Sequence, residues 1–448
     1  MNARRPRQLR SLALAGVLLL SACGRSETDR DTEAAAQAAN PAGLSPGKGG
    51  LSAVFSTASF AAVAADESRA AEVGREVLNN GGNATDAAVA MYFALSVTLP
   101  SAASLGASGA CIVHNSTTRA AEAFVFGPVA APGPINGAAF MVPVGVRAMT
   151  LMHVRHGQAR WEQTVSGAER LARFGMPVSR ALARDLQAGG AGIGGKMFGR
   201  AGGAMLVEGD SWTQPELAAT LGTIRSRGGV DFFQGALARS MSDQIAQMGG
   251  SMPLESLRSA VPKASAPGGE NYGTFGRQRV YVAPTQAGNT ALAGWKGQAP
   301  AGGTPSDSGG FAGLAAVDGK GGAAACSLSM GQLFGSRVVI PGAGILLGAP
   351  TPEAASVSPL IIAYPGNGEF VFAGAGGGAP TAAQATGAVA RAVIESGQSV
   401  AAALAQRRGQ GGYVNAIACR DGLRSSPTTC QSAIDPAGAG LALIAGGR

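Results

Sequence analysis

The architecture of this 448-residue chain follows from two adjoining segments, Ala70-Ala-Glu-Val-Gly-Arg-Glu-Val-Leu78 and Asn80-Gly-Gly-Asn-Ala-Thr-Asp-Ala-Ala-Val-Ala90. Apolar residues recur in both segments at helical spacing, and Gly81-Gly82 interrupts the pattern where a helix is expected to end. Asn83 to Asp86 then offers N-cap residues for a second helix, and Pro100 terminates that helix. Two consecutive helices between residues 67 and 98 are therefore predicted.

Strand patterns follow these helices. A glycine-rich turn at residues 105–109 leads into an apolar strand at 110–114, and residues 118–127 predict its hairpin partner. Turn signals at 318–321 and 366–368 separate further antiparallel strands, predicted at 311–317, 323–329, 360–363 and 369–373. Helical patterns occupy residues 142–179, 210–248 and 381–405. Helices that cover sheets on both sides give an α+β fold class with layered architecture.

The first 22 residues have the pattern of an export signal. Four arginines precede the apolar stretch Leu12–Leu20, which is too short to span a bilayer, and small residues come before Cys23. Leu20-Ser-Ala-Cys23 resembles the bacterial lipobox, so Cys23 is predicted to be lipidated and to hold the chain on a membrane. An ordinary signal peptide with an incidental cysteine is the alternative. Because Gly24 stands where an aspartate would indicate inner-membrane retention, we expect the periplasmic side of the envelope, with the outer membrane favoured.

Composition divides the rest of the chain. Residues 23–50 predict a flexible tether behind the lipidated cysteine, 51–290 a first structured region, 291–310 a Gly/Ser/Pro-rich linker, and 311–448 a second region. Loss of the signal would leave 31 of the 35 basic residues against 27 acidic ones, a net charge of +4. No basic stripe interleaved with aromatic residues is present in the sequence, so nucleic acid is not an expected partner.

The cysteines other than Cys23 form an even set in a compartment that permits disulfides. Cys419 and Cys430 flank a Ser-Pro-Thr-Thr stretch that predicts a surface loop, and we expect them to be bridged. Cys111 and Cys326 lie inside apolar strand patterns. They are expected to be small buried hydrophobes, with a bridge between them as the alternative.

Several segments, in the same order along the chain, resemble the γ-glutamyltranspeptidase family. Besides the two opening segments, these are residues 105–109, 170–179, 214–221, 333–347, 356–359 and 374–378. The resemblance implies a four-layer αββα N-terminal-nucleophile hydrolase fold, made as a precursor that cuts itself before a threonine. That threonine would attack γ-glutamyl amides such as glutathione, with its own α-amine as base and backbone N–H groups as the oxyanion hole. No metal and no organic cofactor are implied.

The family's catalytic strand, Thr-Thr-His-x-Ser-x-x-Asp, is not preserved. Counting back from Asp318 places Phe311 at the nucleophile, and Ala312, Gly313 and Ala315 at the second threonine, the histidine and the serine. Phenylalanine has no nucleophilic atom and cannot drive self-cleavage. A shifted alignment would recruit a hydroxyl just upstream; linker polarity is the alternative explanation of these residues, which are Thr304, Ser306 and Ser308.

The substrate-binding residues that the resemblance implies are also depleted. Residues 124–128 lack the arginine that would hold the substrate carboxylate, Gly331 replaces an asparagine, and residues 348–352 lack the acidic pair for the amine. Each lost charge-assisted hydrogen bond is worth roughly 1.5–3 kcal/mol. The remaining pocket candidates are Ser329, Gly331 and Ser356, the second of the family's paired serines. Gly377 and Gly378 match the oxyanion-hole glycines, although a tight turn would also require glycine.

The expected function is that of a γ-glutamyltranspeptidase-like envelope lipoprotein that is a pseudoenzyme and is not self-cleaved. The alternative is a divergent γ-glutamyl hydrolase or transferase with a relocated Ser or Thr. A small γ-glutamyl or other amide ligand is compatible with both hypotheses. His114, His153 and His156 lie far in sequence from the motifs and are expected to be structural or exposed.

Overall fold

The computed structural model describes residues 60–190, 193, 195–200, 202–266, 272–298, 309–407 and 411–446. The predicted signal peptide, Cys23, the tether and the hydroxyl residues Thr304, Ser306 and Ser308 lie outside the described residues. Within the described ranges, no helix is long and apolar enough to cross a membrane.

A seven-stranded antiparallel sheet runs in the order β17-β1-β9-β10-β2-β3-β6. Its strands are β1 (Ala61–Ala65), β2 (Ser108–Asn115), β3 (Ala120–Phe126), β6 (Lys263–Ser265), β9 (Phe311–Val317), β10 (Ala323–Ser329) and β17 (Leu441–Ala445). Every residue of β9 and β10 is buried. The sheet combines strands from both predicted regions, so these two regions form one body.

A second, six-stranded sheet has the order β16-β15-β14-β13-β8-β7. It consists of β7 (Tyr272–Phe275), β8 (Gln278–Val282), β13 (Leu360–Tyr364), β14 (Glu369–Gly377), β15 (Tyr413–Cys419) and β16 (Cys430–Ile434). The predicted strands at 311–329 and at 360–373 are confirmed, and each pair forms a hairpin in a different sheet. Two short ribbons, β4–β5 (Met176–Pro177 and Ser211–Trp212) and β11–β12 (Val339–Ile340 and Ile345–Leu346), complete the strands of the described part.

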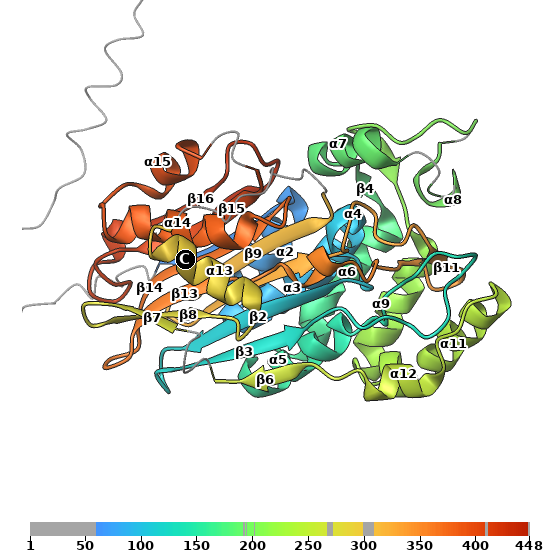
Figure 1. Cartoon of the computed structure of the whole chain (residues 1–448), viewed down its shortest axis with the longest axis horizontal. Helices are drawn as coiled ribbons and strands as arrows, with labels where there is room; N and C mark the ends of the chain where they lie inside the picture. Colours follow the sequence, from blue (N-terminus) through green and yellow to red (C-terminus); the bar gives the residue numbers. More distant parts are fainter. Residues whose placement is uncertain are drawn as a thin grey trace, which may run out of the picture. The chain divides into compact units, whose positions relative to one another are not determined.

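Helices cover the outer face of each sheet (Figure 1). On the seven-stranded side lie α2 (Ser68–Asn79), α3 (Ala84–Thr98) and α5 (Gly145–His156), with α6 (Trp161–Phe174) and α9 (Pro215–Arg227) packed beyond them. On the six-stranded side lie α13 (Gln286–Trp295), α14 (Ala382–Ile394) and α15 (Val400–Ala405). An apolar cluster that includes Ala62, Ile112, Ala315, Phe370 and Ile417 fills the space between the sheets. The predicted four-layer αββα architecture is therefore confirmed.

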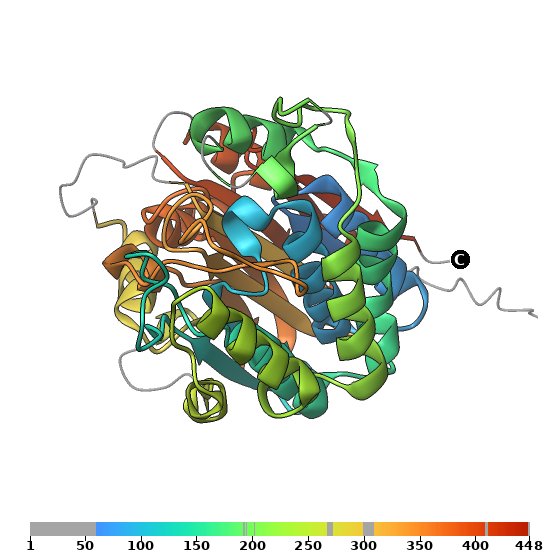
Figure 2. The same cartoon turned by 90° about the vertical axis from the view of Figure 1, so that its right-hand side faces the viewer.

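The remaining helices surround the seven-stranded side. They are α4 (Pro100–Ala103), α7 (Arg180–Gly189), α8 (Gly195–Phe198), α10 (Asp231–Gln234), α11 (Ala236–Gln247) and α12 (Leu254–Ser259). Figure 2 shows α2 and α3, in blue, beside the strands, with green helices on their outer side.

The opening pair of helices forms as the sequence predicts. Gly81 has a φ of +86°, which glycine adopts without strain, and it ends the first helix. Asn83 then makes a capping box with Asp86 at the start of α3. Asp318, from the turn between β9 and β10, accepts a further hydrogen bond from the Ala84 N–H at 3.1 Å. The capped end of α3 is thereby attached to the strand that begins at Phe311.

The predicted boundary of the linker is wrong at its first residues. Residues 286–295 form α13 instead of irregular chain, with Leu292 and Trp295 buried. The glycines in this segment weaken its helical sequence pattern. They are present because two helices pack closely here. A Cβ on Gly294 would lie 2.1 Å from the Gln384 carbonyl oxygen, and one on Gly387 would lie 1.9 Å from that of Ala291. These glycines allow α13 and α14 to approach each other closely.

Both cysteine pairs are bridged. Cys419 and Cys430 face each other across β15 and β16, which confirms the predicted disulfide. The expectation that Cys111 and Cys326 are unpaired hydrophobes is wrong, because they also form a disulfide. The physical reason is strand register: residues 111 and 326 lie directly opposite on neighbouring strands β2 and β10, a juxtaposition that 215 residues of separation conceal.

Candidate functional site

Phe311 is the first residue of β9 and is 3% exposed. It pairs with Ser329 across the β9–β10 ladder. Its carbonyl oxygen accepts a hydrogen bond from the Gly378 N–H at 2.8 Å, and the preceding carbonyl, of Gly310, accepts one from the Met330 N–H at 2.8 Å. Phe311, which the sequence predicts at the nucleophile position, therefore has a buried, apolar side chain, and its backbone is hydrogen-bonded to β14 of the second sheet.

The two predicted oxyanion-hole glycines lie beside this residue. A Cβ on Gly377 would lie 2.1 Å from Asp66 Oδ2 and 2.8 Å from the Ala312 Cα, so close approach of β14 to β9 requires glycine. Gly378 has a φ of +79°, and its N–H is engaged by the Phe311 carbonyl. In this arrangement the N–H of Gly378 already has a hydrogen-bond acceptor within the protein.

A buried carboxylate that the sequence did not single out lies at the same place. Asp66 directly follows β1, and its Oδ2 accepts a hydrogen bond from the Gly313 N–H at 2.7 Å. The Asn415 Nδ2 donates both to Asp66 Oδ1 and to the Gly313 carbonyl, each at 2.9 Å. Burial raises the pKa of Asp66 to about 6, although these hydrogen bonds oppose the rise. The run Asp66-Glu67-Ser68 resembles ordinary helix-capping residues, and Glu67 does cap α2, which hides the different role of Asp66.

Ser329 and Gly331 form the turn that follows β10. The fully buried Oγ of Ser329 accepts a hydrogen bond from the Gly331 N–H at 2.9 Å. Gly331 has a φ of +82°, and a Cβ there would lie 2.1 Å from the Ala349 carbonyl oxygen. Backbone therefore fills the space that an asparagine side chain would need at this position.

Ser356 lines a cleft of about 480 Å³. Its segment is joined to the turn after β10, because the Ser108 hydroxyl lies within hydrogen-bonding distance of both the Ser329 and the Ala354 carbonyl oxygens, at 3.2 and 3.1 Å. The cleft also receives polar side chains from the starts of α13 and α14 and from the 3₁₀ turn Pro352–Ala355: Thr285, Gln286, Thr290, Glu353, Thr381 and Gln384. Glu353 is the single ionisable side chain among the described lining residues. The Oγ1 of Thr381 is buried and has no hydrogen-bond partner. A cleft of this size and lining can hold a small polar ligand, but its described lining residues include no lysine or arginine that would pair with a carboxylate.

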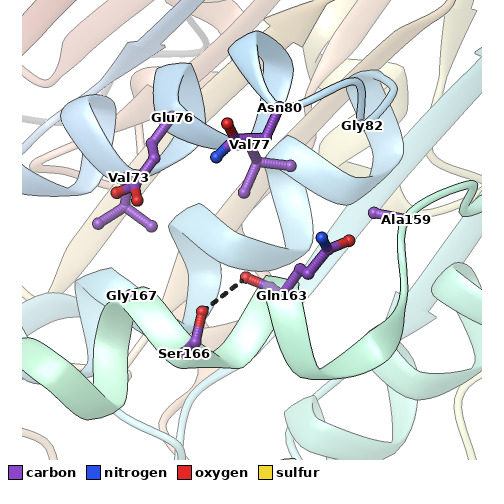
Figure 3. A pocket seen from close by; sticks show the side chains of 9 residues that line it. All are labelled: Val73, Glu76, Val77, Asn80, Gly82, Ala159, Gln163, Ser166 and Gly167. Atoms are coloured by element: carbon purple, nitrogen blue, oxygen red, sulfur yellow. Dashed lines mark hydrogen bonds between the residues drawn. The ribbon is translucent and has the colours of Figure 1, made fainter.

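A smaller cavity, of about 80 Å³, lies between α2 and α6 (Figure 3). Ser166 donates to the Gln163 carbonyl oxygen at 3.2 Å on one wall, and Glu76, on the other, pairs with Arg170 at 2.8 Å. A space of this volume accommodates a few water molecules. None of its lining residues belongs to the surroundings of Phe311.

The histidines have structural contacts, as expected. His114 Nε2 lies 3.2 Å from the Gly368 carbonyl oxygen, His153 lies 3.4 Å from the buried Asp86, and His156 lies 2.7 Å from Glu122. Over the described residues, no group of three or more His, Cys, Asp or Glu side chains could hold a metal ion.

Comparison with known proteins agrees with this geometry. The Gamma-glutamyltranspeptidase family profile matches residues 70–295, half of the chain. Scoloptoxin SSD14 of Scolopendra dehaani is 30% identical over 220 residues, which cover 45% of this chain and 38% of the relative. The glutathione hydrolase proenzyme of Bacillus subtilis is 30% identical over 210 residues, covering 42% and 36%. The matches thus span less than two fifths of the length of either relative.

A solved structure extends the likeness over the whole body. The cephalosporin acylase from Bacillus halodurans superposes with a TM-score of 0.69, at 19% identity, over 89% of this chain and 99% of that chain. This likeness concerns the fold alone. Taken together, the opening helices, the αββα layers and the family profile show that the chain belongs to the γ-glutamyltranspeptidase family.

Proposed function

We propose that this protein is a catalytically silent γ-glutamyltranspeptidase-family member that binds a ligand in the cell envelope and is not cut into two subunits. The observation that carries the proposal is Phe311, buried at the start of β9 where the family requires a nucleophile. Self-cleavage and acyl transfer both need a hydroxyl or thiol with a base that removes its proton. Ser329, directly opposite, accepts the Gly331 N–H at its Oγ, and no histidine, lysine or carboxylate side chain of the described residues is hydrogen-bonded to that oxygen.

The cleft beside Ser356 supports a binding role with a ligand other than a γ-glutamyl group. No lysine or arginine lines it among the described residues, so a substrate carboxylate would be desolvated without a counter-charge. Hydroxyl and amide side chains offer hydrogen bonds to an uncharged ligand instead. Lipidation of Cys23 would keep this cleft in the envelope, consistent with the lipobox-like sequence that precedes it.

Processing and turnover test the proposal on the purified full-length protein. We expect one band of uncut length on a reducing denaturing gel, and no release of p-nitroaniline from γ-glutamyl p-nitroanilide. Two fragments from a cut within residues 300–312, together with turnover, would overturn it. An active family enzyme assayed in parallel controls for the detection limit.

A divergent enzyme is the second candidate, and one observation favours it. Thr381 lies three residues after Gly378, lines the cleft, and has a buried Oγ1 without a partner. If Thr381 or an upstream hydroxyl were a relocated nucleophile, amide hydrolysis would be lost in Thr381→Val or in the Ser306→Ala/Ser308→Ala variant. No hydrolysis by the wild-type protein removes this candidate.

A further inference from the structure

A second cleft, of about 470 Å³, lies where α2 and α7 begin. Its polar lining consists of Ser68 and Arg69 from α2, Ser179 and Arg180 from the start of α7, and Glu208. Backbone of the segment 438–440 closes one side. It shares no lining residue with the cleft beside Ser356, and of the segments that resemble the family only 170–179 contributes to it, through residues 177–179.

Arg69 and Arg180 give the lining of this cleft an excess of positive charge. The Arg69 side chain is half-buried. Burial raises the pKa of the neighbouring Glu67 carboxyl, and the positive charge of Arg69 opposes that rise. The neighbouring carboxylate of Glu67 is fully buried and binds the Ala70 N–H at 3.0 Å. Arg180 is 79% exposed and lies 3.5 Å from Glu208. Two guanidinium groups against one lining carboxylate leave a net charge of +1.

The hydroxyl groups add hydrogen-bond donors. Ser179 Oγ accepts the Leu182 N–H at 3.2 Å, and its own proton remains able to bind a ligand. Ser68 Oγ makes only a long contact, 3.4 Å, to Glu67. Since Glu67 and Ser179 already cap the two helices, a ligand here would be held by the arginines and hydroxyls, without the helix N–H groups.

We propose that this cleft binds the phosphate group of a small molecule or lipid. Guanidinium groups hold phosphate through paired hydrogen bonds, and a phosphate accepts donors from several directions at once. The donors here come from α2 on one side and α7 on the other, an arrangement that suits the tetrahedral oxygens of phosphate better than a planar carboxylate. Glu208 is a competing acceptor for Arg180, so a bound phosphate would displace it.

Calorimetric titration of the full chain with inorganic phosphate at constant ionic strength tests this site. We expect saturable binding that Arg69→Gln weakens by about tenfold or more, because a hydrogen-bonded charge pair is lost. Glu208→Gln should instead tighten binding about threefold, because the competing carboxylate is removed. Arg75→Gln is the matched control, since Arg75 lies on the same helix but does not line the cleft.

Three results would overturn the proposal: no saturable binding by the wild type, equal losses in Arg69→Gln and Arg75→Gln, or no gain in Glu208→Gln. The thermal unfolding midpoint of each variant separates loss of the site from loss of the fold. Glycerol phosphate and phosphatidylglycerol vesicles, tested as separate ligands with the same variants, distinguish a soluble phosphate ester from a lipid headgroup.

Discussion

Asp66 provides a direct test of the energetics at the junction of the two sheets. Burial raises the pKa of its carboxyl from an ordinary value of 3.8 to about 6 in the folded protein. The folded state therefore binds this proton more tightly than the unfolded chain does. The corresponding stability is fully present below pH 3.8 and is lost as the pH rises through 6. A shift of about two pKa units corresponds to about 3 kcal/mol, of which about 2 kcal/mol falls between pH 4.5 and 7.5.

Urea unfolding between pH 4.5 and 7.5 measures this effect in the wild type and in Asp66→Asn. The substitution also changes stability by an amount that does not depend on pH, because the amide of the new asparagine must face the Nδ2 of Asn415. The informative quantity is the pH dependence, and the variant should lose about 2 kcal/mol less than the wild type across this range. Other carboxyls with raised pKa, such as Glu67, contribute equally to both proteins and cancel in the difference. Asp421→Asn, at an exposed position, should behave as the wild type. Identical slopes for the wild type and Asp66→Asn would refute the reasoning.

Three further predictions concern packing, capping and anchoring. Gly377→Ala should destabilise the fold by about 1–3 kcal/mol in thermal or urea unfolding, because the new Cβ would meet Asp66 Oδ2. Gly366→Ala is the control and should be neutral, because the space around Gly366 is open. Equal losses of stability in the two variants would contradict the close approach of β14 to β9. Asn83→Ala should lower the free energy of unfolding by about 1–2 kcal/mol in the same assay, because it removes the cap of α3 and the 2.7 Å hydrogen bond to the His156 carbonyl oxygen. An unchanged unfolding midpoint would show that the capping box is dispensable. Cys23→Ser should abolish labelling with radioactive palmitate and release the protein from the membrane fraction; retained label would exclude Cys23 as the lipidated residue.

The positions of helices and strands could be predicted from the sequence better than the pairing of strands and the contacts between helices. The capping residues of α3 and the strands at 311–329 and 360–373 follow from local patterns, because caps, turns and burial act over a few residues. Strand register between distant segments is set by packing of the whole body, and no local pattern encodes it. For that reason the sequence offers the bridge between Cys111 and Cys326 only as the alternative. Likewise, the glycines of α13 weaken its helical pattern although they permit its contact with α14.

The residues of the candidate site were also predictable only in part. The resemblance assigns Phe311, Gly377 and Gly378 to one site, and the structure has these residues adjacent. Asp66 could not be predicted, because its partners Gly313 and Asn415 are 247 and 349 residues away and a lone aspartate before a helix has a common local explanation. The cleft around Ser356 likewise depends on five segments that meet only in the folded chain.

The disulfide between β2 and β10 has a consequence for any cut in the linker. Cys111 belongs to the region before residues 299–308 and Cys326 to the region after them. A protease that severed the linker would therefore leave two fragments joined by a covalent bond, migrating as one species until a reductant is added. If Cys23 carries lipid, the same bond would keep the second fragment attached to the membrane-bound first fragment.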